Sequence, residues 1–63
     1  MPIMQVFLIE GRDEEQKARL IEALTSAAVE SIQAPPESVR VIITEVPKNQ
    51  FGIAGKTAKA LGR

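Results

Sequence analysis

The sequence contains no histidine, cysteine, tyrosine or tryptophan, and only two phenylalanines. Without histidine or cysteine, no side chain has an ordinary pKa close to neutrality, and only a terminal α-amine starts near pH 8. The same absence excludes disulfides and metal sites built from cysteine or histidine. Acid–base chemistry at neutral pH is therefore expected from the amino terminus.

The charge balance disfavours nucleic-acid binding. Eight acidic and eight basic residues give a formal net charge of zero, so the chain lacks the basic surface that nucleic-acid binding requires. The apolar run from Pro2 to Ile9 is too short for a membrane span or for a signal-peptide core with its cleavage site. We expect a cytoplasmic protein with no membrane or nucleic-acid partner.

The chain is short for its hydrophobic content. Its 63 residues are expected to form a single domain, residues 1–63, of which 44% are hydrophobic. A chain of this size buries only about 60% of its unfolded surface. Since disulfides and Cys/His metal sites are excluded, oligomerisation is the remaining common source of stability.

The first half of the chain predicts a strand and a long helix. Residues 3–9 are apolar on both alternating faces except at Gln5, which indicates a strand covered on two sides. Gly11 ends the strand, and Asp13 with Gln16 three residues later predicts a capping box. A helix is expected over residues 14–33. Its apolar face is predicted to contain Leu20, Leu24, Ala27, Ala28 and Ile32.

The second half predicts a parallel strand and a hairpin. Pro35 and Pro36 end the helix. Residues 39–46 are rich in β-branched side chains and predict a second strand, closed by Pro47. A strand–helix–strand crossover makes the two strands parallel. Residues 48–56 contain two glycines and predict a short hairpin. The fold class is α/β (α+β): a small β-α-β unit with two parallel strands, one long helix and a C-terminal β-hairpin, assembling into an oligomer.

Pro2 is the candidate working group. If Met1 is removed, as is usual before a small residue, the chain begins with a secondary amine at the end of an apolar strand. Such an amine acts as a base at neutral pH only if an apolar pocket or nearby cations lower its pKa. Arg12 and Arg40 are the candidate cations. Each of these residues also has an ordinary structural interpretation. A proline after methionine usually marks only Met removal and a non-helical start, and an arginine after a glycine, such as Arg12, is usually a solvated loop charge. An arginine on a strand, such as Arg40, usually extends its charge to solvent or pairs with a carboxylate.

Several segments together resemble the 4-oxalocrotonate tautomerase family. They are Pro2 behind Met1, Leu8-Ile9-Glu10-Gly11-Arg12, Gln16-Lys17, Ala34-Pro35, Ser38-Val39-Arg40-Val41-Ile42-Ile43-Thr44-Glu45 and Phe51-Gly52-Ile53. The resemblance covers nearly the whole chain. It departs from the family pattern at Phe7, where the family has a polar residue, around Pro47, Asn49, Gln50 and Ala54, and after Lys56.

The resemblance implies a homohexamer, a trimer of dimers, that moves a proton on dienol and keto acids such as 2-hydroxymuconate, without a cofactor or metal. Pro2 resembles the amino-terminal general base. Arg40 resembles the arginine that binds the 2-oxo or 2-hydroxy group and the neighbouring carboxylate, and Arg12 the one that binds the far carboxylate. Phe51 resembles the aromatic wall of the site. The backbone of Ile9 corresponds to the position that orders a water, and Ser38 is a further substrate-binding candidate. The resemblance also implies sites shared between subunits.

Two other classes of function remain open from the sequence. A hydratase or dehalogenase of the same superfamily would use Pro2 as a general acid and would need a carboxylate to activate water. A non-catalytic assembly protein, or a small DNA-binding dimer, would need neither. Glu10 and Glu45 are interpreted as surface or interface ion pairs, and Lys17, Lys48, Lys56 and Lys59 as solvated charges.

Overall fold

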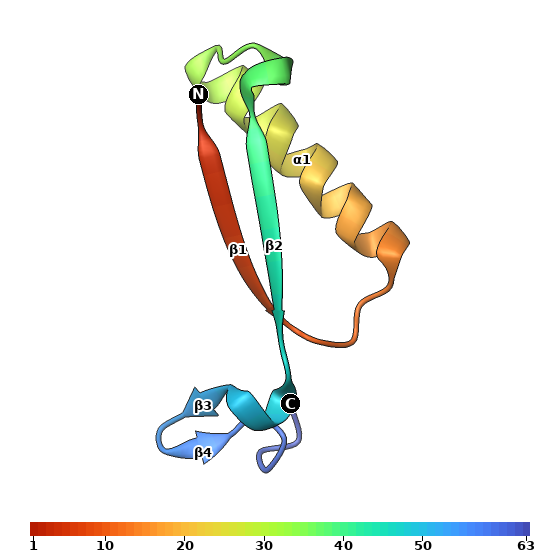
Figure 1. Cartoon of the computed structure of the whole chain (residues 1–63), viewed down its shortest axis with the longest axis vertical. Coiled ribbons are helices and arrows are strands. Elements are labelled where there is room, and N and C mark those ends of the chain that lie inside the picture. The colour runs from red at the N-terminus through yellow and green to blue at the C-terminus, as the bar shows by residue number, and fades with distance from the viewer.

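The protein is built on two parallel strands joined by one helix (Figure 1). The computed structural model describes all residues 1–63 and has extents of 42 × 24 × 14 Å. Strand β1 (Ile3–Ile9) is followed by helix α1 (Glu14–Ile32), the short 3₁₀ turn η1 (Pro36–Ser38) and strand β2 (Arg40–Val46). The strands pair in parallel from Ile3↔Arg40 to Ile9↔Val46. The predicted β-α-β unit is confirmed, with β2 beginning one residue later than expected.

The ends of α1 follow from local chemistry. The side chain of Asp13 accepts a hydrogen bond from the Gln16 amide at 2.8 Å, and the Gln16 side chain accepts one from the Asp13 amide at 3.1 Å. This is the predicted capping box, and it satisfies two amides that the first helical turn leaves free. The helix ends at Ile32 because Gln33 adopts the left-handed conformation (φ 53°). Pro35 and Pro36 follow and prevent continuation.

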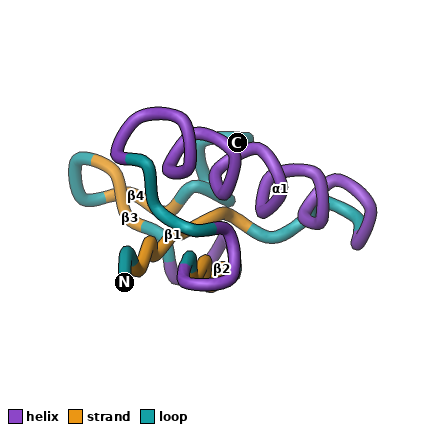
Figure 2. Tube along the Cα trace, turned by 90° about the horizontal axis from the view of Figure 1, so that it is seen from above, coloured by secondary structure: helices purple, strands orange, loops and turns teal.

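Helix α1 covers only one face of the two-stranded sheet (Figure 2). Leu20 and Leu24 are half-buried and Ala28 is buried, which confirms that part of the predicted apolar face. Ala27 and Ile32 are exposed in the protomer: Ala27 is turned away from the predicted face, whereas Ile32 has the spacing of that face but is left uncovered. Ala27 lies about 100° around the helix from Ala28, away from the sheet. Ile32 is the last helical residue, and nothing in the protomer covers it.

The other face of the sheet carries large apolar side chains in the open. Ile3 is 63% exposed, Phe7 64% and Ile42 47%, and by register they share one face with Gln5, Arg40 and Thr44. Only three residues of the protomer are buried, and all are alanines: Ala28, Ala34 and Ala58. A protomer with so thin a core and an exposed apolar face is typical of a subunit that assembles through that face.

The C-terminal segment forms the predicted hairpin. A 3₁₀ turn, η2 (Lys48–Gln50), leads into β3 (Gly52–Ile53) and the antiparallel β4 (Lys56–Thr57). The two linking residues, Ala54 and Gly55, have φ values of 52° and 84°. Positive φ at both central positions is typical of the type I′ turn, whose twist matches that of a hairpin. Figure 1 shows this segment beyond the carboxyl ends of β1 and β2, away from α1. The chain has no helix long and apolar enough to cross a bilayer.

Candidate active site

Pro2, Ser38 and Arg40 gather where β1 and β2 begin. The Arg40 amide donates a hydrogen bond to the Pro2 carbonyl at 2.9 Å, so the parallel pairing continues one step past the strand. The proline therefore lies beside the start of β2, where η1 turns the chain into the strand. The two residues are 38 positions apart in sequence, and the crossover through α1 brings them together.

The Arg40 guanidinium is held by main-chain oxygens. Its Nη1 donates to the Glu37 carbonyl at 2.6 Å and lies 3.4 Å from the Val39 carbonyl. The Ser38 hydroxyl donates to the Pro35 carbonyl at 2.8 Å. Neither side chain has a carboxylate partner, which leaves the guanidinium charge available for an anionic ligand. The interpretation of Arg40 as a charge paired with a carboxylate does not hold in the protomer.

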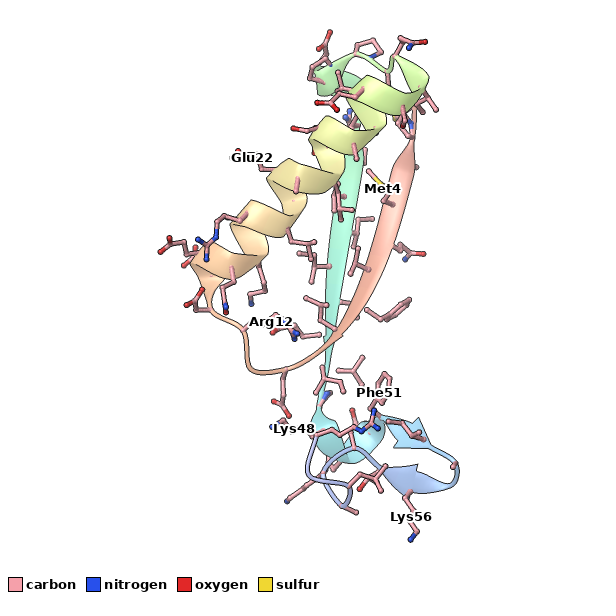
Figure 3. The ribbon with its side chains drawn as sticks, turned by 180° about the vertical axis from the view of Figure 1, so that it is seen from behind. Met4, Arg12, Glu22, Lys48, Phe51 and Lys56 are labelled. Carbon is pink, nitrogen blue, oxygen red and sulfur yellow. The ribbon has the colours of Figure 1, made fainter.

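Ile9, Arg12 and Phe51 lie at the opposite end of the sheet. Gly11 turns the chain after β1 with φ 131°, a conformation that other residues rarely adopt. The turn brings Arg12 Nη1 to 3.5 Å from the Ile9 carbonyl. Phe51 follows β2 and η2, and Figure 3 shows Arg12, Lys48 and Phe51 at this end, away from Met4. An open depression here is lined by Ile9, Glu10, Gly11, Arg12, Gln16, Lys48 and Arg63.

One protomer therefore separates the predicted site residues into two groups. Strand β1 spans seven residues, so about 20 Å of strand divides Pro2 from Arg12. No side chain bridges that distance. A site that uses both residues requires a second copy of the chain.

The charged residues between these groups have structural partners. Lys17 and Glu45 form an ion pair at 3.1 Å that joins α1 to β2, so the ion-pair interpretation of Glu45 is confirmed and the solvated interpretation of Lys17 is wrong. Glu10 makes no ion pair within the protomer; its Oε2 accepts a hydrogen bond from the Lys48 amide at 3.0 Å. The sequence carries no signal for this contact, because the partner of Glu10 is a main-chain group 38 residues away.

The fold is that of a small β-α-β subunit with an uncovered sheet face, and its candidate catalytic groups stand at the strand ends. Comparison with known proteins places it. The family model described as "Tautomerase enzyme" matches residues 2–61. The chain is 56% identical to a 2-hydroxymuconate tautomerase of Stutzerimonas stutzeri over 63 residues, all of both chains. It belongs to the tautomerase family, and its activity is that of an isomerase of the tautomerase type.

Solved structures agree with this placement. A structure from work on the 4-oxalocrotonate tautomerase isozymes of Methylibium petroleiphilum has a TM-score of 0.95 and 56% identity, covering 98% of this chain and 100% of that one. A heterohexameric 4-oxalocrotonate tautomerase from Chloroflexus aurantiacus has a TM-score of 0.92 and 38% identity, covering 97% and 98%. Together with the exposed sheet face, the oligomeric relatives indicate that this chain forms an oligomer.

Proposed function

We propose that the protein converts 2-hydroxymuconate-like dienols to conjugated 2-oxo acids, with the amino-terminal Pro2 as general base. The observation that carries this proposal is the full-length similarity to a 2-hydroxymuconate tautomerase. The chain's own geometry supports it, because Arg40 begins β2 directly beside Pro2. Such a reaction belongs to the breakdown of aromatic compounds, and we place the enzyme in the cytoplasm.

The proposed step is a proton transfer along a conjugated system. The Pro2 amine accepts the proton of the 2-hydroxyl group, the double bonds shift, and the same proton is returned to carbon 5. Negative charge spreads over the oxygen and the dienolate, where fixed guanidinium groups stabilise it. Arg40 binds the 2-oxo group and the adjacent carboxylate, and Arg12 binds the far carboxylate. Their planar donors suit carboxylates, and holding both ends fixes the reacting carbons against the base.

The site requires more than one subunit, and we propose a homohexamer built as a trimer of dimers. Strand β1 has a free edge because the sheet contains only β1 and β2. Two copies related by a two-fold axis can pair their β1 edges in antiparallel fashion. That pairing brings Pro2 of one copy to the Ile9–Arg12 end of the other. Ile9 then offers its backbone to a bound water, and Ser38 and Phe51 complete the wall of the pocket.

Removal of Met1 is a condition of the proposal. In the full chain the Pro2 nitrogen is part of a peptide bond and has no basic lone pair. Met1 is 78% exposed and so is accessible to an aminopeptidase. The free amine must be neutral to act as a base, so kcat/KM rises with pH through its pKa. A general acid would give the opposite dependence.

The test combines intact mass with a ketonisation assay on 2-hydroxymuconate. Protein lacking Met1 is expected to turn over rapidly, whereas protein retaining Met1 and Pro2→Ala are expected to lose activity by about 100-fold or more. Arg40→Gln is expected to lose activity, while the matched control Arg19→Gln, on the exposed helix surface, keeps it. Full activity of Pro2→Ala would refute the proposed base. Halide release from 3-haloacrylates in place of ketonisation would favour the hydratase or dehalogenase class.

A further inference from the structure

We propose that Glu10 is a positioning residue that holds the C-terminal segment, residues 47–63, in a fixed orientation toward the turn carrying Arg12. Phe51 lies in this segment, so Glu10 would set the aromatic wall of the pocket relative to the arginine. The kinetic part of this inference rests on the roles proposed above for Arg12 and Phe51. The structural part rests only on contacts within the protomer.

Two hydrogen bonds fix Glu10 between the strands and the segment. Its amide donates to the Val46 carbonyl at 3.0 Å, at the end of β2. Its Oε2 accepts from the Lys48 amide at 3.0 Å, at the start of η2. The Lys48 amide opens a 3₁₀ turn and has no partner within that turn. A carboxylate is the favoured acceptor there, because the hydrogen bond is charge-assisted.

This contact is the only hydrogen bond between residues 1–46 and residues 47–63. Every other bond of the C-terminal segment is internal to it. They join Gln50 to Pro47, Ala58 to Phe51, Lys59 to Lys48, Ala60 and Leu61 to Thr57, Gly62 to Lys59, Arg63 to Ala58, and β3 to β4. Both ion pairs of the protomer lie within residues 1–46. Without the Glu10 side chain, no hydrogen bond or ion pair would join the two parts, and only the covalent chain at Val46–Pro47 would connect them.

The shape of the protomer makes the orientation of the C-terminal segment depend strongly on this contact. Figure 1 shows the segment extending beyond the sheet end, with neither strand nor helix packed along it. A small rotation at Pro47 would therefore move Phe51 relative to Arg12. Misplacement of a positioning group by about 1 Å can cost on the order of 100-fold in rate. A single well-placed acceptor is thus expected to matter more here than in a densely packed protein.

The alternative is that Glu10 acts only through its negative charge, and the test must distinguish this role from the hydrogen-bonding role. The adjoining depression is lined by Glu10 and by three basic residues, Lys48, Lys59 and Arg63, together with Asn49 and Gly62. None of these cations lies within ion-pair distance of Glu10. Glu10→Gln removes the charge but keeps an oxygen that accepts a hydrogen bond. Glu10→Ala removes both.

The same hydrogen bond can also be removed by deleting its donor, the backbone amide of Lys48. Lys48→Pro removes the amide, and proline is tolerated at the first position of a helical turn. The preceding Pro47 already has the extended conformation (φ −59°, ψ 145°) that a following proline requires. Lys48→Ala is the matched control, because it removes the same side chain and keeps the amide.

Two readouts decide the proposal in the assembled protein. Amide hydrogen exchange at Lys48 is expected to be about 10-fold faster in Glu10→Ala and near wild type in Glu10→Gln. KM for 2-hydroxymuconate is expected to rise about 5- to 10-fold in Glu10→Ala and in Lys48→Pro, with little change in Lys48→Ala or Glu10→Gln. The double variant Glu10→Ala/Lys48→Pro is expected to be no worse than either single variant.

Unchanged Lys48 exchange in Glu10→Ala would overturn the proposal, and so would a Glu10→Gln variant that behaves like Glu10→Ala. Additive losses in the double variant would also overturn it. If Glu10→Ala does not assemble, Lys48→Pro against Lys48→Ala makes the same comparison. If wild-type protein does not turn over 2-hydroxymuconate, the proposed function fails, while the exchange experiment still decides the role of Glu10.

Discussion

Phe7 offers the sharpest test of assembly through the open sheet face. The residue is 64% exposed in the protomer. A phenylalanine presents roughly 200 Å² of surface, so about 130 Å² would be covered on assembly. At about 25 cal/mol per Å², that area contributes about 3 kcal/mol per protomer. Phe7→Ser removes nearly all of this apolar area while leaving the strand hydrogen bonds in place, so the assembly is expected to weaken by up to that amount.

The assay is sedimentation velocity or native mass spectrometry over a protein concentration series. Wild-type protein is expected to remain assembled at concentrations where Phe7→Ser dissociates, since 1.4 kcal/mol corresponds to a factor of ten in an association constant. Gln5→Ser is the matched control: it changes the next outward-facing position of the same strand without removing much apolar surface. Activity is expected to fall in parallel with dissociation, because Pro2 and Arg12 stand at opposite ends of one protomer.

An unchanged mass distribution for Phe7→Ser across the series would refute this reasoning, and would show that another surface carries the assembly. If Gln5→Ser weakened the assembly as much as Phe7→Ser, the contribution assigned to the apolar area of Phe7 would be refuted. A dissociated variant that retained full activity would contradict the shared site and leave the assembly argument intact.

Three smaller predictions follow from local geometry. Each is a change in the free energy of unfolding, measured from the midpoint of urea denaturation at a fixed protein concentration. Asp13→Ala removes the capping box and is expected to cost about 1 kcal/mol, whereas Asp13→Ser restores most of it; equal stability of the two variants would contradict the cap's role. Ala54→Gly relieves a positive φ of 52° and is expected to stabilise the hairpin by a few tenths of a kcal/mol to about 1 kcal/mol; a loss of stability would argue against the type I′ turn. A double-mutant cycle on Lys17 and Glu45 is expected to give a coupling below about 1 kcal/mol that weakens in high salt, because both side chains are partly exposed; a salt-independent coupling would point to a drier contact.

Much of the fold could be predicted because its signals are local. The capping box needs only Asp13 and Gln16, the helix stop needs the proline pair, and the hairpin needs two glycines close together. The parallel pairing follows from chirality once a helix joins two strands. The errors fell where the answer depends on packing: Ile32 has the correct helical spacing for the apolar face, but the protomer offers nothing to cover it.

The candidate site was harder because its geometry is not local. Residue types and a family resemblance singled out Pro2, Arg12 and Arg40, and those assignments remain predictions. The contact between Glu10 and Lys48 carried no sequence signal at all. Its donor is a backbone amide, and every residue except proline supplies one. Acidic residues near a turn are common, so the pattern alone favoured an ion pair.

The thin core and the divided site have one physical cause. A two-stranded sheet with a single helix can bury only one of its faces, so Phe7 and Ile42 remain exposed. The length of β1 also places its start and the turn after it about 20 Å apart, so one protomer cannot join Pro2 to Arg12. Assembly resolves both problems: the proposed pairing of β1 edges brings the strand ends of two copies together, and further copies of the chain cover the apolar face. Stability and activity in this protein are therefore expected to depend on protein concentration in the same way.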